Sequence, residues 1–143
     1  SAGEASPAWS PDGGRIVYAS DAAGVGAPQL YIMGRTSPAA RLTTRGSENG
    51  GPDWGKNGKI AYASRRGGHY AIVVYDPAAQ SHQVVSTDSA DYEDPSWAPD
   101  GRHLFCSRKA GGRSDIYLLD TLGDPPVRLT QNGGNWRSPA CSP

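Results

Sequence analysis

The chain alternates between short apolar runs and turns rich in glycine, proline, asparagine and aspartate. Each run is about four to six residues long, which is typical of β-strands bounded by turns. Within the run 15–20, Ile16 and Tyr18 alternate with Val17, so both faces of the predicted strand are apolar. That pattern indicates a sheet covered on both sides. The predicted strands form three sets: 15–20, 59–64 and 103–107; 29–33, 70–75 and 115–119; 41–43, 83–86 and 127–130.

A Pro-x-Trp segment precedes each group of runs and is the predicted first strand of the group. It starts at Pro7, Pro52 and Pro95, and a truncated copy starts at Pro139, so the spacings are 45, 43 and 44 residues. Four short strands at this period are typical of a β-propeller blade. A β-sandwich would not explain repetition at the level of single residues.

We therefore expect an all-β chain, a partial β-propeller over residues 1–143 with about three blades of four antiparallel strands. Three blades do not close a ring and would leave apolar faces in water. We expect either missing N-terminal blades or a homodimer that closes a six-bladed ring. The repeats are predicted at about 4–48, 49–91 and 92–135, followed by the first strand of a further blade at 136–143.

The residues that follow each Pro-x-Trp segment are of the types that form a tight turn. Proline presets φ, an aspartate or asparagine side chain accepts from nearby amides, and glycine supplies positive φ. Asp12, Asn57 and Asp100 fill the same slot and are predicted to form turns rather than to catalyse or bind metal. The tryptophans that recur at the repeat period are predicted to pack between blades: Trp9, Trp54 and Trp97.

Composition and charge narrow the function. The chain has 14 Lys+Arg and 14 Asp+Glu, and this neutral balance argues against a nucleic-acid module and an anionic-membrane binder. No apolar run approaches the roughly 20 residues of a membrane span. The N-terminus looks like a mature or trimmed end rather than a signal peptide. Two cysteines are too few for a disulfide framework; Cys106 is predicted to be a buried free thiol, and pairing with Cys141 is left open.

The segments that lead into each first strand vary most and are predicted to be loops around one mouth of the channel. The acidic residues among them could accept a cation or basic partner groups, or form a solvated acidic loop. Trp136 beside Arg137 has the composition of an interface hot spot, or packs against a missing blade. The candidate partner-binding residues are Glu4, Glu48, Asn49, Asp91, Tyr92, Glu93, Asp94, Trp136 and Arg137.

Other candidate groups have plain structural interpretations. His69, His82 and His103 lack metal-ligand spacing and are predicted at the surface or at strand edges. The pairs 65–66 and 108–109 are predicted to be solvated hairpin tips. No serine lies in a nucleophile-elbow motif. The residues therefore indicate no catalytic group, metal or cofactor.

The motif Pro-x-Trp-Ser-Pro-Asp-Gly, followed by Tyr-Ala-Ser, Leu-Tyr-Ile-Met and Arg-Leu-Thr, resembles the PD40 (WD40-like) repeat of TolB-type propellers along the whole chain. The order of repeats is most similar to that in the C-terminal half of proteins of that family. Two departures are Cys141 in place of a tryptophan and 55–57 in place of Ser-Pro-Asp.

The resemblance implies a non-enzymatic, periplasmic propeller that binds the lipoprotein Pal of the Tol-Pal envelope system through its mouth loops. PD40 repeats also occur in the propeller of prolyl-oligopeptidase-like serine peptidases, which is the alternative. A weaker third reading is a sugar- or lactone-acting propeller enzyme with a channel metal.

Overall fold

The computed structural model describes residues 7–21, 24 and 26–130, and within them all regular structure is β-strand. The strands form three four-stranded antiparallel sheets in the orders β1-β2-β3-β4, β5-β6-β7-β8 and β9-β10-β11-β12. We call these sheets blades 1, 2 and 3. The strands are β1 (Ala8–Trp9), β2 (Arg15–Ser20), β3 (Gln29–Gly34), β4 (Ala40–Arg41), β5 (Glu48–Trp54), β6 (Ile60–Arg66), β7 (His69–Asp76), β8 (Ser81–Val84), β9 (Asp91–Trp97), β10 (His103–Ala110), β11 (Arg113–Asp120) and β12 (Val127–Arg128).

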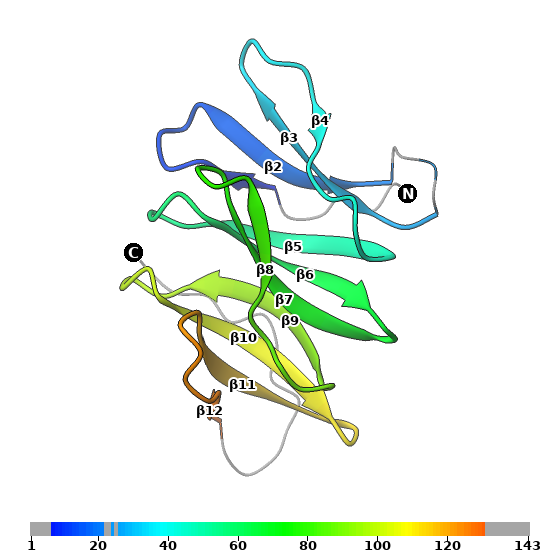
Figure 1. Cartoon of the computed structure of the whole chain (residues 1–143), viewed down its shortest axis with the longest axis vertical. Helices are drawn as coiled ribbons and strands as arrows, with labels where there is room; N and C mark the ends of the chain where they lie inside the picture. The colour runs from blue at the N-terminus through cyan, green and yellow to red at the C-terminus, as the bar shows by residue number, and fades with distance from the viewer. Residues whose placement is uncertain (1–6, 22–23, 25, 131–143) are drawn as a thin grey trace.

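The blades stack face to face along the molecule (Figure 1). The first strands β5 and β9 lie against the preceding blade. This arrangement confirms the predicted all-β blades of four antiparallel strands. The strand predicted at 136–143 lies outside the described residues.

The turn between the first two strands of each blade has the predicted geometry. The amide N–H of Gly14 donates to Oδ1 of Asp12, and that of Lys59 donates to Oδ1 of Asn57, both at 2.9 Å. In blade 3, Oδ1 of Asp100 accepts from the backbone amides that follow it. These donors, first that of His103 and then that of Arg102, lower the pKa of Asp100 to about 2. Asp12, Asn57 and Asp100 are thus turn-formers, as predicted.

The first strands of blades 2 and 3 share a bulge. Gly51 and Asp94 occupy equivalent positions with positive φ, 62° and 54°, and each precedes a proline. The strand pairing is irregular at the same place in both blades. Because proline cannot donate to the sheet ladder, the chain departs from regular pairing here. Pairing resumes directly after the proline, at Asp53 in β5 and at Ser96 in β9.

Two apolar clusters fill the spaces between the blades. Trp54 lies in the cluster between blades 1 and 2 and Trp97 in that between blades 2 and 3, only 7% and 8% exposed. Both are inter-blade packing residues, as predicted. Trp9 is 62% exposed because no described blade lies against that face of blade 1, so its packing between blades stays a prediction.

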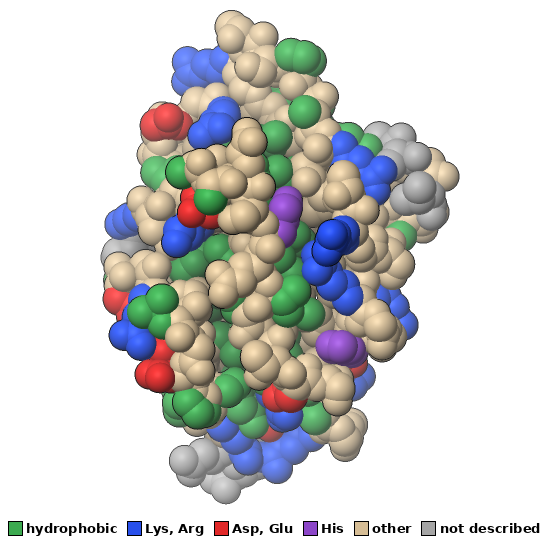
Figure 2. Space-filling view, viewed as in Figure 1, with side chains coloured by type: hydrophobic (Ala, Val, Ile, Leu, Met, Phe, Trp, Pro, Cys, Tyr) green, Lys and Arg blue, Asp and Glu red, His purple; other side chains and the backbone are tan. Residues whose placement is uncertain are grey.

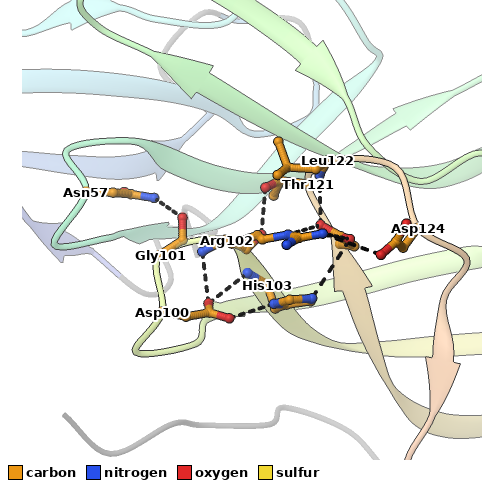
Figure 3. A network of polar contacts seen from close by, with 9 residues as sticks. Asn57, Asp100, Gly101, Arg102, His103, Thr121, Leu122 and Asp124 are labelled. Atoms are coloured by element: carbon orange, nitrogen blue, oxygen red, sulfur yellow. Dashed lines mark hydrogen bonds and ion pairs between the residues drawn. The ribbon is translucent and has the colours of Figure 1, made fainter.

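Polar contacts join blades 2 and 3 beside the apolar cluster. The Trp97 backbone N–H donates to Oδ2 of Asp53 at 2.8 Å, and its indole Nε1 donates to the Asp53 carbonyl at 3.2 Å. Asn57 Nδ2 donates to the Gly101 carbonyl at 2.9 Å (Figure 3). Asp53 and Asn57 therefore bind the neighbouring blade as well as their own.

A second polar network lies within blade 3 at the same end and joins the start of β10 to the end of β11. Arg102 donates to both carboxylate oxygens of Asp120, at 2.9 and 2.7 Å, and lies 3.4 Å from Asp124 (Figure 3). The hydrogen bond from Arg102 holds the pKa of Asp120 well below its usual range. His103 Nδ1 lies 2.6 Å from Oδ2 of Asp100, so this histidine belongs to the turn.

Cys106 is fully buried on β10 and unpaired. Burial raises the pKa of its thiol to about 12, so the group stays protonated. This confirms the predicted buried free thiol; Cys141 lies outside the described residues.

Gly55 departs from the repeat motif because the Trp97 ring lies against it. A Cβ at Gly55 would come within 2.7 Å of the Trp97 Cδ1 atom. We expect Gly55→Ala to lower the free energy of unfolding by about 1–3 kcal/mol, the usual cost of overpacking. Chemical denaturation measures this change.

Gly50→Ala provides the matched control, because nothing lies within 4 Å of its Cβ position and its φ is not positive. Equal losses in the two variants would contradict close contact between Gly55 and Trp97.

Candidate functional site

The candidate site is the end of the blades where β5 and β9 begin, which we call the mouth end. Since the strands are antiparallel, β6 and β10 end there, and the hairpin tips at 67–68 and 111–112 lie beside those starts. The first-strand turns lie at the opposite end, which we call the far end. The prediction that residues 48–49 and 91–94 are loops is wrong: they open β5 and β9. They pair with the ends of β6 and β10 up to the bulge.

Glu48 and Asp91, from blades 2 and 3, are brought together by Tyr70 of β7. The Tyr70 hydroxyl donates to Oε2 of Glu48 at 3.0 Å, and the Tyr70 amide donates to Oδ1 of Asp91 at 2.8 Å. Burial, and then the hydrogen bond to Glu48, raise the pKa of Tyr70. The guanidinium of Arg65 lies over the Tyr70 ring, 5.3 Å from its centroid. This is within the roughly 6 Å of a cation–π contact. Both acids are half-buried and fixed in place.

Tyr92 belongs to a second set of contacts within blade 3. Its ring is fully buried, and its hydroxyl donates to Oδ2 of Asp88 at 2.9 Å. Arg108 Nε donates to that hydroxyl at 3.0 Å, and its guanidinium also lies over the Tyr117 ring. Burial, followed by the bond to Asp88, raises the pKa of Tyr92, so the phenol stays protonated. Arg108 is therefore not a solvated tip, because two aromatic rings and Asp88 hold it.

Asn49 joins blades 1 and 2, and its side chain is not accessible to a binding partner. It is fully buried, and its Nδ2 donates to Oε1 of Gln29 at 2.7 Å and to the Arg45 carbonyl at 2.9 Å. Thr43 donates to the same Gln29 oxygen at 2.8 Å. Asn49 and Tyr92 thus support the mouth end from inside and present little side chain to solvent.

The remaining candidates differ in what is known of their surroundings. Glu93 and Asp94 are half-buried; the Glu93 carbonyl accepts from the Ser107 hydroxyl at 3.2 Å. Glu4, Trp136 and Arg137 lie outside the described residues.

Within the described ranges, no three His, Cys, Asp or Glu side chains are grouped to hold a metal ion. An open pocket of about 360 Å³ lies beside β9, lined by Asp88, Ser89, Ala90, Asp91, Arg108, Lys109, Ala110 and Gly111.

Sequence reasoning missed Tyr70 and Arg108 as members of the mouth end. Tyr70 occurs in an apolar run, and its role depends on Asp91 of the next blade. One signal was available for Arg108: on an antiparallel hairpin, a basic residue beside two tyrosines can stack on them. The structure thus defines a class of protein: a β-propeller with a polar, partly acidic mouth end.

The comparisons with known proteins identify the family. The profile of the PD40 family, the TolB β-propeller domain, matches residues 1–143, and the chain belongs to this family. It is 37% identical over 79 residues to the Tol-Pal system protein TolB of Methylobacillus flagellatus, and the aligned region covers 55% of this chain and 18% of that protein. It is 31% identical over 85 residues to the Tol-Pal system protein TolB of Nitrosomonas europaea, covering 59% and 20%.

Solved structures agree with this assignment. TolB from Acinetobacter baumannii superposes with a TM-score of 0.80 at 28% identity, over 94% of this chain and 34% of that one. The chain spans about a fifth of the length of the curated relatives above. A puromycin hydrolase superposes with a TM-score of 0.75 over 96% of this chain and 23% of that one, at 18% identity, which shows a shared fold only. In the described residues no helix is long and apolar enough to span a membrane.

Proposed function

We propose that this chain is part of the protein-binding propeller of a Tol-Pal system protein. In this proposal it is non-enzymatic and periplasmic, and its mouth end binds a Pal-like lipoprotein. The observation that carries the proposal is the similarity to TolB proteins of the Tol-Pal system, at 37% and 31% identity. The peptidase alternative rests on relatives whose likeness shows the fold alone.

The geometry supports the mouth end as the contact surface. Hydrogen bonds to Tyr70 hold Glu48 and Asp91 in fixed positions, so binding would cost little side-chain entropy. Glu48, Asp91, Glu93 and Asp94 place acidic groups of two blades at one end, which suits a partner with basic or amide donor groups. Asn49 and Tyr92 act indirectly, by holding the strands that carry these acids.

The test is binding of the soluble domain of the cognate Pal-like lipoprotein, measured by calorimetry. We expect the double variant Glu48→Gln, Glu93→Gln to bind at least about a hundredfold more weakly, because the two charge-assisted hydrogen bonds that it weakens contribute about 1.5–3 kcal/mol each. Asp124→Asn is the matched control, since this acid lies at the far end with its side chain 78% exposed. Failure of the unmodified chain to bind, or equal weakening in both variants, would contradict the proposal.

We also propose that a further blade covers the exposed face of blade 1, as part of a six-bladed ring. Trp9, at 62% exposure, occupies the repeat position that is buried in blades 2 and 3. The covering blade belongs either to the same protein or to a second copy of this chain.

Light scattering on the 143-residue chain separates these two sources. A dimer that Trp9→Lys dissociates would indicate closure by a second copy, whereas a stable monomer would exclude it. The control is Leu122→Lys, which changes an exposed apolar residue of a far-end turn in blade 3.

A further inference from the structure

A polar pocket of about 300 Å³ opens between blades 1 and 2, and none of the acids of the mouth end lines it. It is lined by Thr44, Arg45, Tyr62, Arg66 and His82. Thr44 and Arg45 come from the segment that joins blade 1 to blade 2, and the other three come from β6 and β8 of blade 2. On the face shown in Figure 2, basic side chains gather beside a histidine near the middle of the molecule.

The two guanidinium groups give this pocket an uncompensated positive charge. Within the described ranges no Asp or Glu forms an ion pair with Arg45 or Arg66; the ion pairs there involve other basic residues. Arg66 Nε donates to the Ser64 hydroxyl at 3.0 Å, which orients its side chain without neutralising it. Two cations facing one pocket repel each other, and an anion between them would relieve that repulsion.

The remaining groups are hydrogen-bonding partners held in fixed positions. The Tyr62 hydroxyl lies 2.8 Å from Nδ1 of His82, and the His82 ring packs on Tyr75 with centroids 4.5 Å apart. Burial raises the pKa of Tyr62 to about 12, so its hydroxyl remains a neutral donor. Partial burial, then the charges of Arg66 and Arg45, lower the pKa of His82. Both arginines therefore act on the imidazole.

We propose that this pocket binds an oxyanion, a phosphate or carboxylate group of a small ligand, through Arg45, Arg66 and the hydroxyl groups of Thr44 and Tyr62. Guanidinium groups bind both anions through paired N–H donors, and the hydroxyls can donate to the remaining oxygens. The site does not depend on the proposed function, because it lies outside the acidic group assigned to the partner.

The first experiment titrates the 143-residue chain with inorganic phosphate and, separately, with acetate, at constant ionic strength set by sodium chloride. Binding is followed by NMR through the ring signals of His82. Saturable binding of phosphate alone or of acetate alone identifies the type of anion and supports the proposal. If neither probe gives saturable shifts, the proposal is wrong.

Adjacent residues on β6 supply a matched pair of variants. Arg66→Gln removes a charge that lines the pocket, whereas Arg65→Gln removes the same charge from a side chain stacked on Tyr70. We expect Arg66→Gln to weaken binding about tenfold or more, and Arg65→Gln less than about twofold. Equal effects would overturn the assignment. Circular dichroism confirms that each variant is folded, and Arg45→Gln, expected to act like Arg66→Gln, replaces it if it is not.

A titration of His82 gives a readout that a purely structural role would not move. The groups that face His82 are Tyr62 and Arg66 of β6, Tyr75 of β7 and Arg45. A bound anion stabilises the imidazolium, so the pKa of His82 should rise in the presence of the anion that binds. An unchanged pKa at saturating anion would overturn the proposed position of the site.

Discussion

The contact that the structure depends on is the packing of each first strand against the preceding blade. At the junction of blades 2 and 3, the Trp97 ring lies against Gly55 while its two N–H groups donate to Asp53. A four-stranded sheet with two apolar faces is not stable alone in water, because each face needs a cover. Trp97 therefore buries apolar surface between the two blades and also makes the polar contacts that fix one blade relative to the next.

This constraint explains why so much of the fold follows from the sequence. The tryptophan, the turn and the central strands recur at a nearly constant period, so the blades and the turns of Asp12, Asn57 and Asp100 could be predicted from one repeat. Trp9 shows what a repeat alone does not predict. A repeated residue predicts which side chain packs, but burial also needs a neighbouring blade.

The mouth end could be predicted only in part. Its acids were found because they break the repeat. Strand pairing nevertheless continues beyond the bulge before Pro52 and Pro95, into segments that composition assigns to loops. Asn49 and Tyr92 carry polar groups, but the sequence does not show that both are buried. The pocket between blades 1 and 2 was missed for a related reason: Arg45, Arg66 and His82 are far apart in the chain. Arg66 and His82 meet only when β6 and β8 of blade 2 fold into one sheet, and the segment between blades 1 and 2 adds Arg45.

The most direct test of blade stacking is the hydrogen exchange of the indole N–H protons, with each signal assigned from a Trp→Phe variant. The Trp97 indole donates to blade 2, whereas the Trp9 side chain is exposed. If the blades stack as described, the Trp97 proton should exchange at least about a hundredfold more slowly than that of Trp9, since its exchange requires the blades to separate. Equal exchange rates for Trp97 and Trp9 would contradict the account.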